Sequence, residues 1–153
     1  GAPLAPFNAW QIIQGLETVG LRMKQHCSNA EKVVTFLETQ KKVQNVIYPT
    51  NHQGEIKERA KKYMQGGYGS LVGMDVGTKE NGAKFIDNLK MLYHVANIGD
   101  ARSLAIHPAT TTHSQLNEKE LLAAGVTPGY VRLSIGIEHP DDIIADIKQA
   151  LAA

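Results

Sequence analysis

Arg132 is the residue whose setting most directly indicates binding chemistry. It lies in residues 130–138, where polar and apolar residues alternate, so a strand here has an apolar back and a polar front. The front contains Tyr130, Arg132, Ser134 and Gly136. A guanidinium on a rigid strand offers paired N–H donors to a carboxylate or a phosphate. The alternation alone, however, favours a strand with one face in water and an arginine that keeps this face soluble.

Two loops contain polar residues that could border a ligand site. Residues 97–100, Asn-Ile-Gly-Asp, form a polar turn directly after an apolar segment, a position where turns on an α/β sheet can border a ligand site. The motif by itself favours a plain turn. A second loop places a proline and three threonines between His107 and His113. This wide spacing, the proline and the lack of a nearby third ligand argue against zinc, so no metal site is expected. The threonines can hold the loop's own backbone and border a cleft, and the pattern slightly favours the structural role alone.

Other motifs fit structural roles better than catalytic ones. The glycines in 66–69 lead into a predicted strand rather than a helix, which indicates a turn instead of a phosphate loop. Ser103 and Ser134 lie on no Gly-x-Ser-x-Gly turn, which argues against a serine nucleophile. The lysines lie in charged helix faces or at segment ends, unlike a Schiff-base lysine in an apolar pocket. The sequence therefore contains no complete active site.

Composition places the chain among globular proteins of ordinary domain size. It has 153 residues, of which 42% are hydrophobic and 20% are charged. Because 16 Lys and Arg balance 15 Asp and Glu, neither nucleic acid nor an anionic membrane is an expected partner. No apolar run approaches the roughly 18 residues of a membrane helix. The single Cys27 cannot form an internal disulfide, which fits a reducing cytoplasm.

A long amphipathic helix is predicted over residues 7–38, where apolar residues recur every three or four positions. A straight helix of that length, about 45 Å at 1.5 Å per residue, would overhang its own domain. We expect a bend marked by Gly15 and Gly20, combined with packing of the first half against a domain outside this chain. The start at Gly1, without a methionine, gives the same expectation of a longer protein.

The rest of the chain predicts an α/β domain. Strands are expected over 43–48, 70–76, 93–98, 103–106 and 130–138, and helices over 55–64, 79–92, 117–125 and 141–151. Asn117 and Glu120 have the spacing of a capping box at the start of one helix. The expected architecture is an open sheet of about four or five strands with helices mainly on one face.

Three ordered motifs and the first helix resemble the C-terminal part of the Cys/Met-metabolism family of pyridoxal-phosphate (PLP) enzymes. The motifs are Ala-Asn-Ile-Gly-Asp-Ala-Arg-Ser-Leu at 96–104, His-Pro-Ala-Thr-Thr-Thr-His at 107–113 and Gly-Tyr-Val-Arg-Leu-Ser-Ile-Gly-Ile-Glu at 129–138. The opening Pro-Phe-Asn-Ala-Trp at 6–10, with 15–18 and 21–26, resembles the helix that joins that family's two domains. The resemblance covers essentially the whole chain.

This resemblance implies the small C-terminal domain of the fold-type-I PLP transferase fold, with a mostly antiparallel sheet. Residues 1–40 would form the interdomain helix and 41–153 the substrate-side domain. Arg132 would bind the substrate α-carboxylate, while Asn97 and Ile98 would line the substrate side of the active site. The Schiff-base lysine and the other PLP-binding residues would belong to an upstream domain, so this segment alone would neither bind PLP covalently nor be active. The full-length protein would form a cytoplasmic homotetramer.

Within the family, Asn97 and the triple-threonine loop most resemble the O-acetylhomoserine sulfhydrylases. These enzymes convert O-acetylhomoserine and sulfide, or methanethiol, to homocysteine, or methionine, and acetate. Cystathionine synthases and methionine γ-lyases often have Ser at the position of Asn97, which favours the sulfhydrylase branch. Cystathionine γ-synthase and methionine γ-lyase activities remain the alternatives within the family. An alternative of another class is a stand-alone, non-catalytic α/β module that binds a small anion or regulates another protein.

Overall fold

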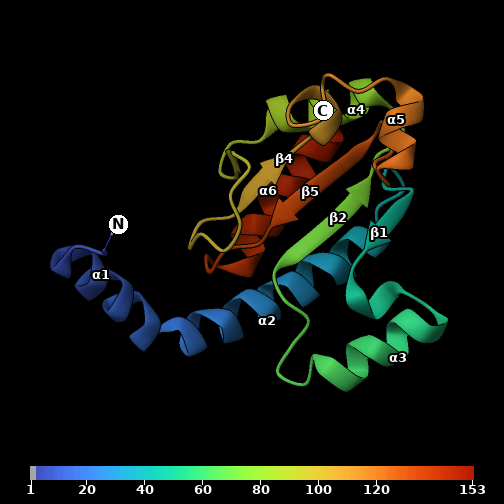
Figure 1. Ribbon diagram of the computed structural model, residues 1–153. Coiled ribbons are helices and arrows are strands. Elements are labelled where there is room, and N and C mark those ends of the chain that lie inside the picture. Colours follow the sequence, from blue (N-terminus) through green and yellow to red (C-terminus); the bar gives the residue numbers. More distant parts are fainter. Residues whose placement is uncertain (1–2) are drawn as a thin grey trace.

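The fold is built around a five-stranded sheet (Figure 1). The computed structural model describes residues 3–153. The strand order is β1-β2-β5-β4-β3. Only the β3–β4 pair is parallel; the other three pairs are antiparallel. The strands are β1 (Asn45–Ile47), β2 (Leu71–Asp75), β3 (Tyr93–His94), β4 (Leu104–Ile106) and β5 (Tyr130–Ser134). The predicted open, mostly antiparallel sheet is therefore confirmed.

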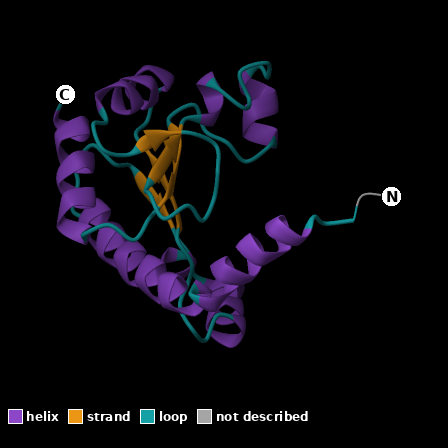
Figure 2. Cartoon of the chain, turned by 90° about the vertical axis from the view of Figure 1, so that its left-hand side faces the viewer, coloured by secondary structure: helices purple, strands orange, loops and turns teal. Residues whose placement is uncertain are grey.

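Three helices cover one face of this sheet, namely α2 (Val19–Glu38), α4 (Lys79–Asn88) and α6 (Pro140–Ala152). The α-helices are α1 (Pro6–Glu17), α2 (Val19–Glu38), α3 (Gly54–Tyr63), α4 (Lys79–Asn88), α5 (Glu118–Ala123) and α6 (Pro140–Ala152), and the short 3-10 turns are η1 (Pro49–Asn51) and η2 (Pro108–Thr110). In Figure 1, α2 and α6 pass behind the strands, and Figure 2 shows the main helical layer on one side of strands seen nearly edge on. The prediction of helices mainly on one face is confirmed.

The core lies between the sheet and these covering helices. The alternation predicted from the sequence is present from Tyr130 to Leu133, because Val131 and Leu133 are fully buried while Tyr130 and Arg132 are only partly buried. It does not extend further, since Ser134, predicted on the polar front, is buried and the strand predicted over 130–138 ends there. The helices contribute fully buried side chains to the same cluster, namely Ala30, Val33, Leu37, Ile143 and Ile147. Truncating one of the buried Leu or Ile side chains to Ala typically costs about 2–5 kcal/mol. This packing holds β5 with its polar front turned away from the core.

The long first helix is interrupted at Thr18, between α1 and α2. Thr18 has φ −109° and ψ 4°, outside helical geometry, so the interruption lies between Gly15 and Gly20 rather than at either glycine. Arg22 reaches back across it, and its Nη2 donates to the Gly15 carbonyl at 3.0 Å. Since an interrupted helix leaves carbonyls without their usual partners, this bond satisfies one of them.

Helix α1 buries none of its side chains within residues 3–153. Its exposed apolar side chains are Phe7, Trp10, Ile12, Ile13 and Leu16. Packing of this helix against another domain, and the division of the chain at residue 40, stay predictions. Gly1 and Ala2, part of the predicted interdomain helix, lie outside the described residues. No helix of the described part has the length and apolar character needed to cross a membrane.

Asp146 of α6 determines where α4 ends. Its carboxylate accepts the backbone N–H groups of Lys90, Met91 and Leu92 at 2.9, 2.9 and 3.0 Å. The helix predicted over 79–92 therefore stops at Asn88, because the following N–H groups turn toward α6. Burial acts to raise the pKa of Asp146, but these N–H donors outweigh it and hold the pKa below its usual value.

Asp146→Asn is expected to lower the free energy of unfolding by about 1–3 kcal/mol, since an amide cannot accept all three N–H groups. A carboxyl pKa that is lower in the folded state stabilises the fold at neutral pH, and this stabilisation is lost as the pH falls through the folded-state pKa. Urea unfolding at several pH values should show that acid loss in the parent chain and a smaller one in the variant. The control Asp87→Asn changes an exposed carboxylate; equal effects of both substitutions would contradict the role of Asp146.

Candidate functional site

The candidate site lies on the sheet face that α2, α4 and α6 leave open. A cavity of about 530 Å³ lies there, and α3 forms its outer wall. Its lining includes Ile47, Ile56, Tyr63, Gly73, Tyr130 and Arg132. The front of β5 thus borders an apolar hollow that contains a strong cation.

Gly73 and Tyr130 shape the floor beside Arg132. Gly73 on β2 pairs directly with Arg132 on β5. A Cβ at Gly73 would lie 2.7 Å from Cε2 of Tyr130, so the glycine makes room for the tyrosine ring on the strand backbone. Burial raises the pKa of Tyr130 above its usual value, and the charge of Arg132 opposes this rise. The phenol therefore stays protonated at neutral pH and forms an uncharged wall.

The guanidinium of Arg132 is fixed by backbone carbonyls rather than by an acidic residue. Its Nη2 donates to the carbonyl oxygens of Ala96 and Asn97 at 2.9 and 3.2 Å. Its Nε is buried and makes no hydrogen bond to any residue in 3–153, and no Asp or Glu of that range forms an ion pair with it. Since a partly buried charge without a counter-ion favours binding of an anion, this geometry suits a carboxylate.

The structure brings two of the three predicted site residues into contact. Asn97 reaches Arg132 through its backbone carbonyl, a contact that does not depend on the amide side chain. Ile98 follows in the same loop with 59% of its surface exposed. The contacts of Asn97 and Ile98 with a substrate stay predictions.

Sequence reasoning missed a structural role for Ser134. Its side chain is 1% exposed, and its Oγ accepts the backbone N–H of Gly99 at 3.2 Å. The serine thus ties the loop that holds Arg132 to the strand that carries it. Its place on the same strand face as Arg132, two residues away, was the available signal.

His107 is a structural residue of the triple-threonine loop. The ring is fully buried; its Nε2–H donates to the Pro128 carbonyl at 2.8 Å, and its Nδ1 lies 2.9 Å from the Thr110 hydroxyl. Burial lowers the pKa of His107, which keeps the ring neutral. The Thr111 hydroxyl donates to the His107 carbonyl at 2.8 Å, so the loop holds its own backbone as predicted. Within 3–153, no group of three or more His, Cys, Asp or Glu side chains could hold a metal ion.

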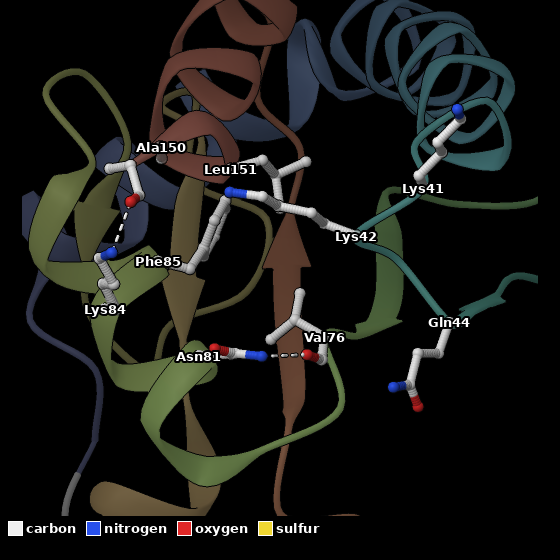
Figure 3. A pocket seen from close by; sticks show the side chains of 10 residues that line it. Lys41, Lys42, Gln44, Val76, Asn81, Lys84, Phe85, Ala150 and Leu151 are labelled. Atoms are coloured by element: carbon white, nitrogen blue, oxygen red, sulfur yellow. Dashed lines mark hydrogen bonds between the residues drawn. The ribbon is translucent and has the colours of Figure 1, made fainter.

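A second, smaller cavity of about 300 Å³ is lined by Lys41, Lys42 and Lys84 and lies beside the end of α6 (Figure 3). Lys84 and Lys42 donate to the carbonyl oxygens of Ala153 and Ala152. These two lysines therefore hold the last residues of the chain. Arg132 is not among the residues that line this cavity.

The open-face cavity lacks the group that an aldehyde cofactor needs for covalent binding. A Schiff base requires a lysine amine, and no lysine is among the residues that line this cavity. The lining offers a guanidinium that suits an anion and does not supply the amine for PLP.

Comparison with known proteins identifies the family. The profile of the Cys/Met-metabolism PLP-dependent enzymes matches residues 1–152. The chain belongs to this family. The resemblance inferred from the motifs is confirmed.

Similar proteins in this family are considerably longer than the chain. An O-acetyl-L-homoserine sulfhydrylase of Leptospira meyeri is 51% identical over 153 residues, which are 99% of this chain and 35% of that protein. A homocysteine/cysteine synthase of Saccharomyces cerevisiae is 42% identical over 98% of this chain and 36% of its own. The chain thus spans about a third of the length of these relatives.

A solved structure confirms the fold class. A putative O-acetylhomoserine (thiol)-lyase of Campylobacter jejuni, which contains a pyridoxyl-lysine monophosphate group, has a TM-score of 0.91 and 44% identity to the chain. The match covers all of this chain and 37% of that one. The predicted fold-type-I PLP architecture is therefore confirmed.

Gly73→Ala is expected to lower the free energy of unfolding by about 1–3 kcal/mol, because its Cβ would overlap with the Tyr130 ring. Urea unfolding of the single and double variants measures this cost. Combining Gly73→Ala with Tyr130→Ala should cost less than the sum of the two single changes. Gly66→Ala, whose Cβ would meet no atom within 4 Å, serves as the control. Additive effects of the pair would rule out the proposed close packing.

Proposed function

We propose that the full-length protein converts O-acetylhomoserine and sulfide, or methanethiol, to homocysteine, or methionine, and acetate. The names of relatives with 51% and 42% identity support this γ-replacement reaction. In this proposal Arg132 binds the α-carboxylate of the amino-acid substrate. The observation that carries this assignment is a guanidinium fixed by two carbonyls, facing an apolar cavity and without an acidic partner in the described part of the chain.

The available donors of Arg132 define how a carboxylate would bind. Nη2 is occupied by the carbonyls of Ala96 and Asn97, whereas Nη1 makes no hydrogen bond to a described residue. A carboxylate bound at Nη1 would replace water with a charge-assisted bond. Tyr130 and Gly73 would form the wall beside it, and Asn97 with Ile98 would line the opposite side.

In this proposal PLP is held by a part of the full-length protein outside this chain. When bound, PLP withdraws electrons from the substrate and so makes the exchange of its γ-substituent possible. The residues of this chain bind and orient the amino acid through its carboxylate and do not react with it. The chain alone would therefore be inactive. The proposal includes a cytoplasmic location and a homotetramer for the full-length protein.

Arg132→Lys and Arg132→Ala in the full-length enzyme are expected to raise the KM for O-acetylhomoserine by about 10- to 100-fold, the range that corresponds to one lost charge-assisted bond. Steady-state kinetics with saturating sulfide measure this change. Arg59→Lys is the matched control, because Arg59 lines the same cavity but is paired with Glu55 at 2.6 Å. An unchanged KM in both Arg132 variants would contradict the assignment of Arg132 to the substrate α-carboxylate.

The exact reaction is decided by offering different substrates to the full-length enzyme. Homocysteine formed from O-acetylhomoserine and sulfide is the expected product. Efficient use of cysteine in place of sulfide would instead indicate a cystathionine γ-synthase, and breakdown of methionine alone would indicate a methionine γ-lyase. Anion binding without turnover of any of these substrates would favour a non-catalytic module.

A further inference from the structure

The loop that fixes Arg132 has little packing of its own. Residues 96–102, here called the arginine loop, are all exposed. Ala96 and Asn97 of this loop accept both hydrogen bonds that orient the guanidinium. An exposed loop without buried side chains is normally among the least stable parts of a fold. The position of the guanidinium therefore depends on whatever ties the arginine loop to the sheet.

Three polar side chains supply these ties, and we call them the loop clamp: Ser103, Ser134 and Glu138. The Glu138 carboxylate accepts the Ser103 backbone N–H at 2.6 Å and the Ser103 hydroxyl at 2.9 Å. The same hydroxyl accepts the backbone N–H of Gly136 at 2.8 Å. Ser134 accepts the N–H of Gly99 from inside the arginine loop. The clamp thus holds the loop at its end and at its middle.

The backbone between the clamp residues packs closely against the arginine loop. A Cβ at Gly136 would overlap with the carboxylate of Glu138, and would lie 2.5 Å from the carbonyl oxygen of Ala101. The backbone N–H of Ile137 donates to that carbonyl at 2.9 Å. The arginine loop therefore lies directly against the chain that continues from β5.

Helix α2 holds the other side of this chain. Nδ2 of Asn29, a fully buried residue, donates to the carbonyls of Gly136 and Glu138 at 3.0 and 2.8 Å. His26 is 2% exposed, and its Nδ1–H donates to the carbonyl of Ile135 at 2.6 Å. Helix α2 belongs to the packed core, so these hydrogen bonds connect the loop clamp to a rigid element, as a precise binding site requires.

We propose that Ser134 and Glu138 are positioning residues for substrate binding, because they hold the arginine loop where its carbonyls orient Arg132. This inference rests on the proposed function of Arg132 as the carboxylate anchor. Neither residue touches the substrate. Their contribution is to keep the guanidinium in the binding orientation before the substrate arrives, which reduces the free-energy cost of ordering it on binding.

Ser134→Ala and Glu138→Gln in the full-length enzyme test this role. Each should raise the KM for O-acetylhomoserine about three- to tenfold, the effect of losing one or two ordinary hydrogen bonds, while kcat and the KM for sulfide stay within about twofold. Ser70→Ala is the matched control, since this buried serine next to β2 accepts the backbone N–H of Ile135 through its own backbone carbonyl, which the substitution keeps. If Ser134→Ala does not fold, Glu138→Gln, which keeps the shape of the side chain, decides the question.

A double-mutant cycle separates positioning from a merely structural role. In an Arg132→Lys background, Ser134→Ala or Glu138→Gln should change KM by less than twofold, because the group that they position is already gone. Additive effects on KM, or a loss of thermal stability with KM unchanged, would overturn the proposal. The two proposals also fail differently. An unaltered KM in Arg132→Lys rejects the carboxylate anchor itself, whereas a raised KM there with normal clamp variants rejects only the loop clamp.

Discussion

The pairing of β5 with β2 on one side and β4 on the other is the constraint on which the site depends. In this register Arg132 lies opposite Gly73 and Ile106. A slip of one residue would turn Val131 and Leu133 out of the core and Arg132 into it. Burial of those two side chains against α2 and α6 therefore fixes, at the same time, the core of the domain and the face that carries the cation.

A cation fixed in this way has an unusual environment. Surface arginines commonly meet carboxylates, as Arg59 meets Glu55 one helical turn away. Arg132 instead meets two uncharged carbonyls and a tyrosine whose pKa is raised by burial, so no described group neutralises it. Carbonyl oxygens orient a guanidinium without cancelling its charge. Such a group remains strongly attractive to an anion. The free-energy cost of reorienting it when an anion binds is small.

Local sequence signals predicted the elements well, but long-range hydrogen bonds set their ends. The capping box of Asn117 and Glu120 is present as its spacing indicated, because both partners lie within one turn of helix. The end of α4 was predicted too late, because it depends on Asp146, which lies more than 50 residues further along the chain. The break at Thr18 differs, because its cause is local: a bend was expected near Gly15 and Gly20, but the non-helical backbone of Thr18, which helical periodicity does not encode, sets its position.

The same distinction applies to the site. Alternation along β5 revealed the face of Arg132, and the ordered motifs gave the arginine its proposed role. Neither could reveal that Ser103 and Glu138, 35 residues apart, meet at the end of the arginine loop. Their side chains are ordinary polar residues until the fold brings them together. In the proposed function Arg132 would bind a part of the substrate that does not react, so these contacts would stabilise the bound substrate and the transition state alike. Such uniform binding is expressed in KM, whereas the chemical step is governed by groups outside this chain in the proposed enzyme.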